Sequence, residues 1–247
     1  MEAIKERGVQ LLSLILLVLA WAVASLVVGE RILPPPTEVF PVAWGMVISG
    51  AFAEPLFASL FRLLLGFILA MSLGVAFGIA SAQLLRLGIA AAAMFTIIMS
   101  TPSLVVIFVA MIMLGQTDLT IILVAGLIVF PFVAVPIRDA MKEIDQDILS
   151  MADSFKISTL RKVVDVYIPY LAPPILAVSR IGFSLSWKIV VLSEVFGFTS
   201  GIGWKISLAY WQYDLRSLIA WLVVFIVIIL FIEQGIRIGE RRVVKWQ

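Results

Sequence analysis

Polar and aromatic residues recur along one apolar stretch in the second half of the chain, where they could act on a charged molecule. On a helix turning about 100° per residue, most of them fall within an arc of about 80°, and Lys188 lies about 40° beyond Ser184. They are Arg180, Ser184, Trp187, Lys188 and Glu194. A charge inside an apolar span costs at least about 2.5–3.5 kcal/mol, so each one requires an ion-pair partner or an aqueous path. This polar stripe therefore predicts ion pairing or the passage of a charged solute.

The depth of each charge separates these possibilities. Counted from Leu171 at about 1.5 Å per residue, Arg180 lies about 14 Å into the stretch, Lys188 about 26 Å and Glu194 about 35 Å. Arg180 can snorkel to the near surface, whereas Glu194 reaches the far interface. Two interpretations of Lys188 stay open: a structural pair with Glu194 or another helix, or a place on a translocation path that favours an anion. Arg62, at the start of another apolar stretch, is expected to snorkel or to form a structural ion pair, in preference to contact with a solute.

Catalysis by the chain itself has little support. The sequence has no histidine and no cysteine, so imidazole and thiolate ligands and Ser-His or Cys-His nucleophile pairs are excluded. The glycine-rich segment 197–205 is not a phosphate-binding loop, because Trp204 separates Gly203 from Lys205 and no Ser or Thr follows the lysine. We expect no catalytic residue and no metal site, and a net charge of +2 does not suggest a nucleic-acid partner.

The composition shows which solvent surrounds these residues. Of the 247 residues, 62% are hydrophobic and 14% charged, and the mean hydropathy is +1.14. A soluble domain has roughly half its residues apolar and about a quarter charged. We therefore predict an all-α, multi-pass membrane protein with one domain over residues 1–247. A span needs about 20 apolar residues, and the expected spans are 9–29, 57–79, 89–114, 119–137, 171–196 and 218–236.

Three segments at or between these spans need separate interpretation. The basic start and Ala22-Val23-Ala24 could indicate a cleavable signal peptide, but the apolar run is too long for one and favours an uncleaved helix. The prolines at 34–36 must end it, and the amphipathic segment 39–49 is expected to lie along the outer surface. Pro102 is expected to kink the third span.

Basic residues predict the orientation. With the N-terminus inside, the cytoplasmic segments hold Lys5, Arg7, Arg86, Arg138, Lys142, Lys156, Arg161, Lys162, Arg237, Arg241, Arg242 and Lys245, and the outer segments hold only Arg31, Lys205 and Arg216. This bias follows the positive-inside rule and predicts that both termini are cytoplasmic.

The longest polar interval, residues 138–170, contains an amphipathic pattern. Ile144, Ile148, Ala152 and Phe155 recur at spacings of three and four, as on a helix with one apolar face. In a generic loop, this pattern would indicate a surface helix tucked under the bundle.

The residues around this helix indicate a family. The run Met151-Ala152-Asp153-Ser154-Phe155-Lys156-Ile157-Ser158, followed by Pro169, resembles the cytoplasmic signature loop of binding-protein-dependent ABC importer permeases. Segments 33–39, 58–67 and 193–203 resemble motifs of the nitrate, sulfonate, taurine and bicarbonate branch. Two positions depart from the pattern: Ser150 stands where an acidic residue is expected, and Lys156 where a glycine would permit a tight bend.

The resemblance implies a type I permease fold and a set of functional residues. A coupling helix would dock into an ATPase subunit through Ile148 and Phe155 as anchors and Asp153 as a polar contact. The full set of coupling residues would be Ile148, Met151, Ala152, Asp153, Ser154, Phe155, Lys156 and Pro169. The polar stripe on the fifth span would line the translocation path.

The resemblance also implies partners and a location. The partners are a second copy of the permease, with which the chain is expected to form a homodimer, two ATP-binding subunits and an extracytoplasmic solute-binding protein. The expected location is a bacterial inner membrane. The chain itself would hold no cofactor, because ATP and Mg²⁺ would be bound by the ATPase.

The expected function is ATP-driven import of a small anion such as a sulfonate, taurine or nitrate. The alternative solutes are a thiamine-precursor pyrimidine, riboflavin or another small aromatic metabolite. An ion-driven secondary transporter is less well supported, because the sequence has no internal repeat and no acidic relay at the midplane.

Overall fold

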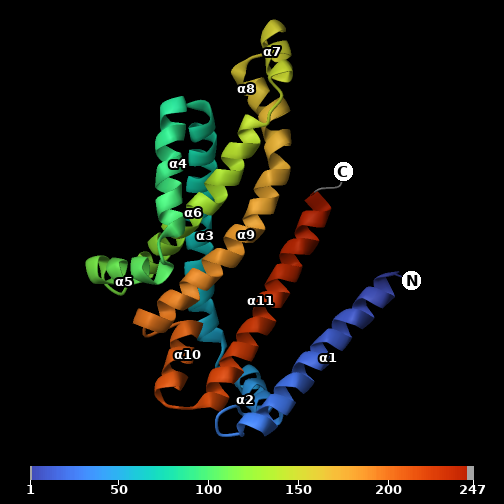
Figure 1. Cartoon of the computed structure of the whole chain (residues 1–247), viewed down its shortest axis with the longest axis vertical. Helices are drawn as coiled ribbons and strands as arrows, with labels where there is room; N and C mark the ends of the chain where they lie inside the picture. Colours follow the sequence, from blue (N-terminus) through green and yellow to red (C-terminus); the bar gives the residue numbers. More distant parts are fainter. Residues whose placement is uncertain (1, 244–247) are drawn as a thin grey trace. The chain divides into compact units, whose positions relative to one another are not determined.

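A computed structural model describes residues 2–243 of the chain. Within this range, the side chains of residues 2–7, 9–11, 85, 146, 149, 153, 159–160 and 236–243 lie outside the description. The described residues form helices and no strand (Figure 1). In chain order they are α1 (Glu2–Val28), α2 (Pro36–Ile48), α3 (Ala53–Gln83), α4 (Leu85–Ser100), α5 (Ser103–Leu114), α6 (Asp118–Lys142), α7 (Gln146–Ser154), α8 (Thr159–Lys162), the π-helix η1 (Val163–Tyr167), α9 (Ile168–Gly197), α10 (Ile202–Trp211) and α11 (Leu215–Val243).

The predicted membrane class is confirmed, and the number of spans agrees approximately. Among the described residues, four helical segments are long and apolar enough to cross a membrane: Ala53–Gln83, Asp118–Lys142, Val163–Gly197 and Leu215–Gly235. The bent pair α4 and α5 would make a fifth. The first expected span is helical, and its apolar part Leu12–Val28 is about 26 Å long at about 1.5 Å per residue.

The third span was predicted as one helix kinked at Pro102, and this prediction is wrong. Helix α4 ends at Ser100, α5 starts at Ser103, and the two are bent by 94°. Proline disfavours the helical conformation in the residue before it, and Thr101 accordingly has φ −76° and ψ 128°. The chain therefore breaks at this point and continues as a separate helix.

The chain divides into two compact units. One comprises Phe57–Gly203, and the other combines the residues up to Leu56 with those from Trp204 onward. The prediction of a single permease domain over residues 1–247 stays a prediction.

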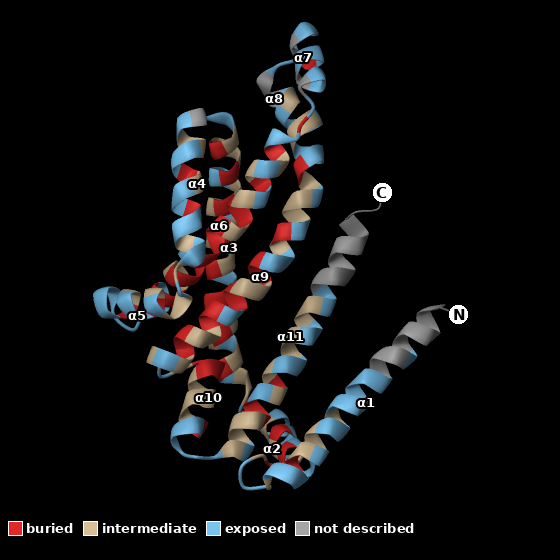
Figure 2. Ribbon diagram, viewed as in Figure 1, coloured by how far each residue is buried: buried red, intermediate tan, exposed pale blue. Residues whose placement is uncertain are grey.

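Helix α6 forms the centre of the Phe57–Gly203 unit. It is 67% buried over its apolar window, and Figure 2 shows the buried residues gathered along it. Val133 and Ile137 of α6 pack against Val178 of α9 and against residues of α3. On another side, Phe130 packs edge-on against Phe95 of α4, with ring centroids 5.7 Å apart. These contacts hold α3, α4 and α9 around α6.

The other unit has its own small core between α2 and α11. Val39 and Ala43 of α2 pack with Ala220 and Val224 of α11. Two side chains of α1 hold the proline-rich turn: Trp21 Nε1 donates to the Pro34 carbonyl at 3.1 Å, and Ser25 Oγ donates to the Leu33 carbonyl at 2.6 Å. The amphipathic segment predicted at 39–49 is therefore a helix, and its apolar face is buried on α11.

Candidate functional site

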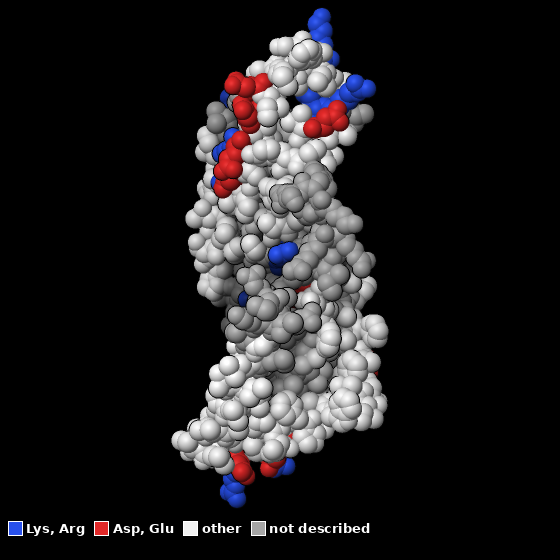
Figure 3. Space-filling model, turned by 90° about the vertical axis from the view of Figure 1, so that its right-hand side faces the viewer, with Lys and Arg blue, Asp and Glu red and all other residues white. Residues whose placement is uncertain are grey.

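The polar loop after α6 contains the predicted coupling helix as α7. Asp145 caps its start, because the Asp147 amide donates to Asp145 Oδ1 at 2.8 Å. Three apolar side chains spaced as on one helix face point out of the fold: Ile148 is 44% exposed, Met151 57% and Phe155 74%. Ala152, which the spacing places beside Ile148 at one edge of this face, is buried. The helix therefore presents an apolar stripe that no described part of the chain covers. Figure 3 shows acidic and basic side chains gathered around the upper end, where α7 lies in Figure 1.

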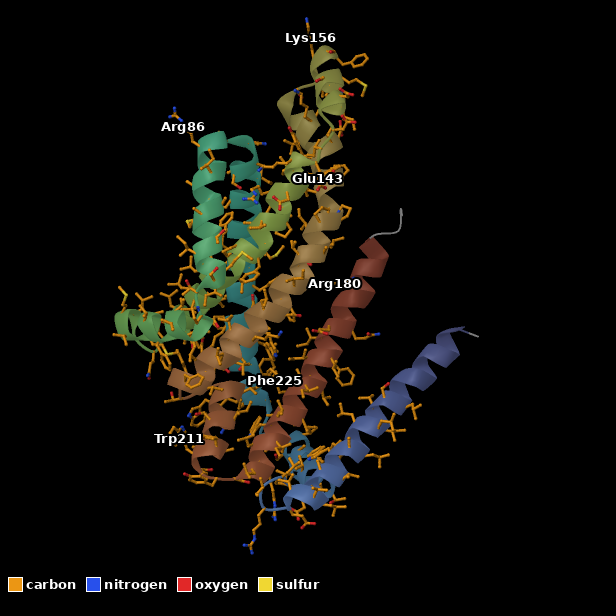
Figure 4. The ribbon with its side chains drawn as sticks, in the orientation of Figure 1. Arg86, Glu143, Lys156, Arg180, Trp211 and Phe225 are labelled. Carbon is orange, nitrogen blue, oxygen red and sulfur yellow. The ribbon has the colours of Figure 1, made fainter. Side chains whose placement is uncertain are left out.

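Lys156 follows α7 in a tight bend, at the position where a glycine was expected. Its φ is +52°, in the left-handed region, and the Ile157 amide donates to the Ala152 carbonyl at 3.0 Å. This is a Schellman cap with lysine at the position usually occupied by glycine. Lys156 is exposed, and its side chain points away from the ribbon (Figure 4). Lysine at this position thus adopts the bend that a glycine would permit.

Other predicted coupling residues have mixed surroundings. Ser154 is exposed and donates to the Ser150 carbonyl at 2.9 Å, and the side chain of Asp153 lies outside the described residues. Pro169 is exposed in the first turn of α9, directly after the π-helix. A proline ring clashes with the carbonyl four residues before it, here that of Asp165, so the wide turn of η1 is consistent with the space that Pro169 requires.

The polar stripe on α9 divides into buried and exposed parts. Trp187 is 3% exposed and Glu194 is fully buried, whereas Arg180 and Lys188 are exposed and Ser184 is intermediate. Figure 4 marks Arg180 on α9. In this conformation, the charged groups of α9 that could meet an aqueous path are thus Arg180 and Lys188, and their place on a translocation path stays a prediction.

Glu194 belongs to a buried polar cluster that the sequence analysis did not assemble. Arg62 Nη1 donates to Glu194 Oε1 at 2.6 Å, and Arg62 Nε donates to Asp118 Oδ1 at 2.7 Å. Ser59 Oγ lies 2.7 Å from Glu194 Oε2, and Arg62 also donates to the carbonyl and hydroxyl of Ser200. The structural ion pair expected of Arg62 is confirmed, but the partner of Glu194 is Arg62 and not Lys188.

The same carboxylate organises the segment between α9 and α10. The Gly203 amide donates to Glu194 Oε2 at 3.0 Å, and the Ile202 amide donates to Ser59 Oγ at 2.9 Å. Gly201 has φ +98°, and a Cβ atom there would overlap the Glu194 carboxylate. Glycine is therefore required at Gly201 both by the backbone conformation and by the approach of the side chain.

This cluster can hold helices in place, and its guanidinium group has no free donor for a solute. All five N–H donors of Arg62 are directed at Glu194, Asp118 or Ser200. Arg62 and Glu194 are 132 residues apart, and no local spacing signals such a pair. Within the described part of the chain, no group of three or more Asp and Glu residues is placed to hold a metal ion.

Comparisons with known proteins show which proteins this chain is similar to. A family model described as the inner membrane component of binding-protein-dependent transport systems matches residues 74–245. A probable ABC transporter permease of Brucella abortus (strain 2308) is 28% identical over 242 residues, which cover 97% of this chain and 96% of that protein.

Two further relatives have names that state a solute. The taurine transport system permease TauC of Escherichia coli (strain K12) is 26% identical over 94% of this chain and 86% of that protein. The putative aliphatic sulfonates transport permease SsuC of Bacillus subtilis (strain 168) is 24% identical over 90% of this chain and 80% of that protein.

Proposed function

Since the chain belongs to the family of binding-protein-dependent transport system inner membrane components, we propose that it is the permease through which an ABC importer carries a small anion into the cytoplasm. The family match over residues 74–245 is the observation that carries this proposal. A permease of this family is not itself an enzyme, and ATP hydrolysis belongs to a separate subunit.

Two observations support an anion as the solute. Relatives that match this chain over most of its length are named for taurine and aliphatic sulfonates, whose sulfonate groups are negatively charged. Lys188 presents an exposed ammonium group on α9, and an uncompensated cation at membrane depth favours an anionic solute. Nitrate is a further candidate. A thiamine-precursor pyrimidine or riboflavin is the alternative, to be tested in the same assay.

We propose that α7 transmits the ATPase cycle to the spans. ATP binding would bring the ATPase subunits together, move the α7 helices of two permease copies and open the pathway outward, and hydrolysis would reset it. The ATP-bound state must stabilise the outward conformation relative to the inward one for this to work. Exposed Ile148, Met151 and Phe155 supply the apolar area for the contact, and Lys156 lies at its edge.

The proposed assembly contains two copies of this chain, two ATPase subunits and a solute-binding protein in a bacterial inner membrane. The excess of basic residues in the α6–α9 loop and near both ends of the chain supports a topology with both termini in the cytoplasm.

Purification of the tagged permease with the products of its neighbouring genes tests the function. We expect an ATPase subunit to co-elute, and the reconstituted complex to take up radiolabelled taurine, an alkanesulfonate or nitrate only with ATP inside and the binding protein outside. Uptake by the chain alone in an ion gradient would contradict the proposal.

Two variants test the assigned residues in that assay. Phe155→Ala should reduce ATPase co-elution, whereas Val164→Ala, a change at a 51% exposed apolar residue of the same loop, should not. Lys188→Met should weaken discrimination between anions and neutral analogues, and Lys188→Arg should retain it. Unchanged selectivity of an intact Lys188→Met complex would remove Lys188 from the path.

A further inference from the structure

A cleft lies at the end of the α2–α11 unit that the proposed topology places outside the cell. Its volume is about 450 Å³, and its walls come from the turn that follows α1, the start of α2 and the turn between α10 and α11. The lining residues used below are Glu30, Arg31, Glu38, Tyr213, Asp214 and Arg216.

An ion pair and a helix cap connect the elements that form this cleft. Arg216 Nε and Glu38 Oε2 lie 2.7 Å apart, and this ion pair joins the first turn of α11 to the first turn of α2. Asp214 caps α11, because the Ser217 amide donates to Asp214 Oδ1 at 3.1 Å.

Tyr213 has an unfavourable backbone conformation in this wall. Its φ is +56°, a region in which a residue with a Cβ atom is strained. The Asp214 amide donates to the Ala209 carbonyl and the Tyr213 amide to the Tyr210 carbonyl, so α10 ends in a Schellman cap whose special position glycine usually fills. Glycine at position 213 would make the same turn without this strain.

The fold gains little from the tyrosine side chain. Tyr213 is 89% exposed, so its ring buries almost no apolar surface that could offset the backbone strain. Residues held in strained conformations cluster at functional sites. A large, exposed aromatic ring beside a charged cleft has the properties of an interface anchor, since tyrosine is enriched among the residues that dominate binding energy.

We infer that this cleft, with Tyr213 as its anchor, is the surface on which the solute-binding protein docks. The inference rests on the proposed function and topology. The partner that fits is a protein surface with a pocket for the tyrosine ring, surrounded by charges that complement Glu30 and Arg31. Charges of both signs around an aromatic anchor suit a polar protein surface and not an apolar ligand.

Variants of the reconstituted complex test this inference. The readout is ATPase stimulation as a function of binding-protein concentration, relative to the unstimulated rate of the same variant. Tyr213→Gly keeps the turn, which glycine makes without strain, and removes the ring. We therefore expect the concentration of binding protein that gives half-maximal stimulation to rise about tenfold or more. Tyr213→Phe should stay close to wild type. Trp211→Ala is the matched control, because Trp211 is 73% exposed in the same region but does not line the cleft.

Photocrosslinking provides an independent measurement. A benzoylphenylalanine at position 213 should form an adduct with the binding protein, and one at position 211 should form much less. A Tyr213→Gly complex that is stimulated like wild type overturns the inference and leaves the proposed function intact, as expected if the ring only anchors in lipid. A wild-type complex that no binding protein stimulates overturns both.

Discussion

Replacing Arg62 by methionine should destabilise the protein strongly, because it leaves Glu194 buried without its counter-charge. Glu194 is fully buried, and the Arg62 side chain is 4% exposed. After the substitution, the carboxylate keeps only its hydrogen bonds from Ser59 and the Gly203 amide. Breaking a buried pair by removing one partner costs about 3–5 kcal/mol, and we expect Arg62→Met to lie in this range.

Removing both charges should cost much less than the sum of the two single changes. Apolar residues of similar volume often replace a buried ion pair at no net cost. The double variant Arg62→Met/Glu194→Met still leaves the Gly203 amide without its acceptor, which costs about 1–3 kcal/mol. We therefore expect a coupling energy of about 2 kcal/mol or more between the two positions. Asp118, whose side chain is 56% exposed, should contribute at most about 1 kcal/mol.

The assay is the free energy of unfolding of the purified chain, obtained by SDS titration in mixed micelles. Wild type, Arg62→Met, Glu194→Met, the double variant and Asp118→Asn are compared. Glu194→Gln replaces Arg62→Met if the latter cannot be purified, with an expected loss of about 1.5–3 kcal/mol for a hydrogen bond to a charged group. Additive single changes, or a loss from Arg62→Met no larger than that from Asp118→Asn, would refute the reasoning.

Three further changes follow from the backbone and the caps. Gly201→Ala should destabilise the chain in the same SDS titration, because alanine is strained at φ +98° and its Cβ atom would overlap the Glu194 carboxylate. Gly45→Ala, whose Cβ atom would meet no neighbouring atom, is the control. Lys156→Gly should raise the free energy of unfolding by about 1 kcal/mol, because glycine adopts the left-handed conformation without strain. Lys156→Ala should not raise it, and equal effects of the two changes would contradict this prediction. The pKa of Asp214 lies below its ordinary value of 3.8 because the Ser217 hydroxyl and amide donate to its carboxylate. This stabilisation is present above pH 3.8 and is lost as the pH falls through the lower pKa of the folded state. The thermal stability of Asp214→Ala should therefore be below that of wild type at pH 7 and approach it as the pH falls below 3.8. A difference in thermal stability that does not change with pH would contradict this prediction.

Local patterns predicted the parts of the fold that depend on neighbouring residues. The apolar runs located the long spans, and the spacing of Ile148, Ala152 and Phe155 located α7. Proline-rich residues 34–36 correctly marked the end of α1 and the entry into α2. These features arise from helical periodicity and from the missing amide of proline, which act over a few residues.

The missed features depend on how distant elements meet. The stripe on α9 placed Glu194 on a polar face, but the sequence does not state which helix that face approaches, so Lys188 remained a possible partner. The actual partner, Arg62, comes from α3. The break at Thr101 and Pro102 was underestimated for a related reason: a proline inside a span either kinks or breaks the helix, depending on whether neighbouring groups satisfy the freed carbonyls.

The buried cluster has a purpose that apolar packing cannot serve. Met71, Val75 and Ile79 of α3 pack at the α6–α9 contact at intervals of four residues, and a slip of one turn, about 5.4 Å, would present similar apolar side chains again. In lipid, hydrophobic burial does not favour one register over another. Ser59 and Arg62 lose their bonds to Glu194 after such a slip, because these bonds are 2.6–2.9 Å long and 5.4 Å is beyond hydrogen-bond reach. The charges therefore select one register of α3 against α9, a specificity that apolar residues at these two positions would not provide.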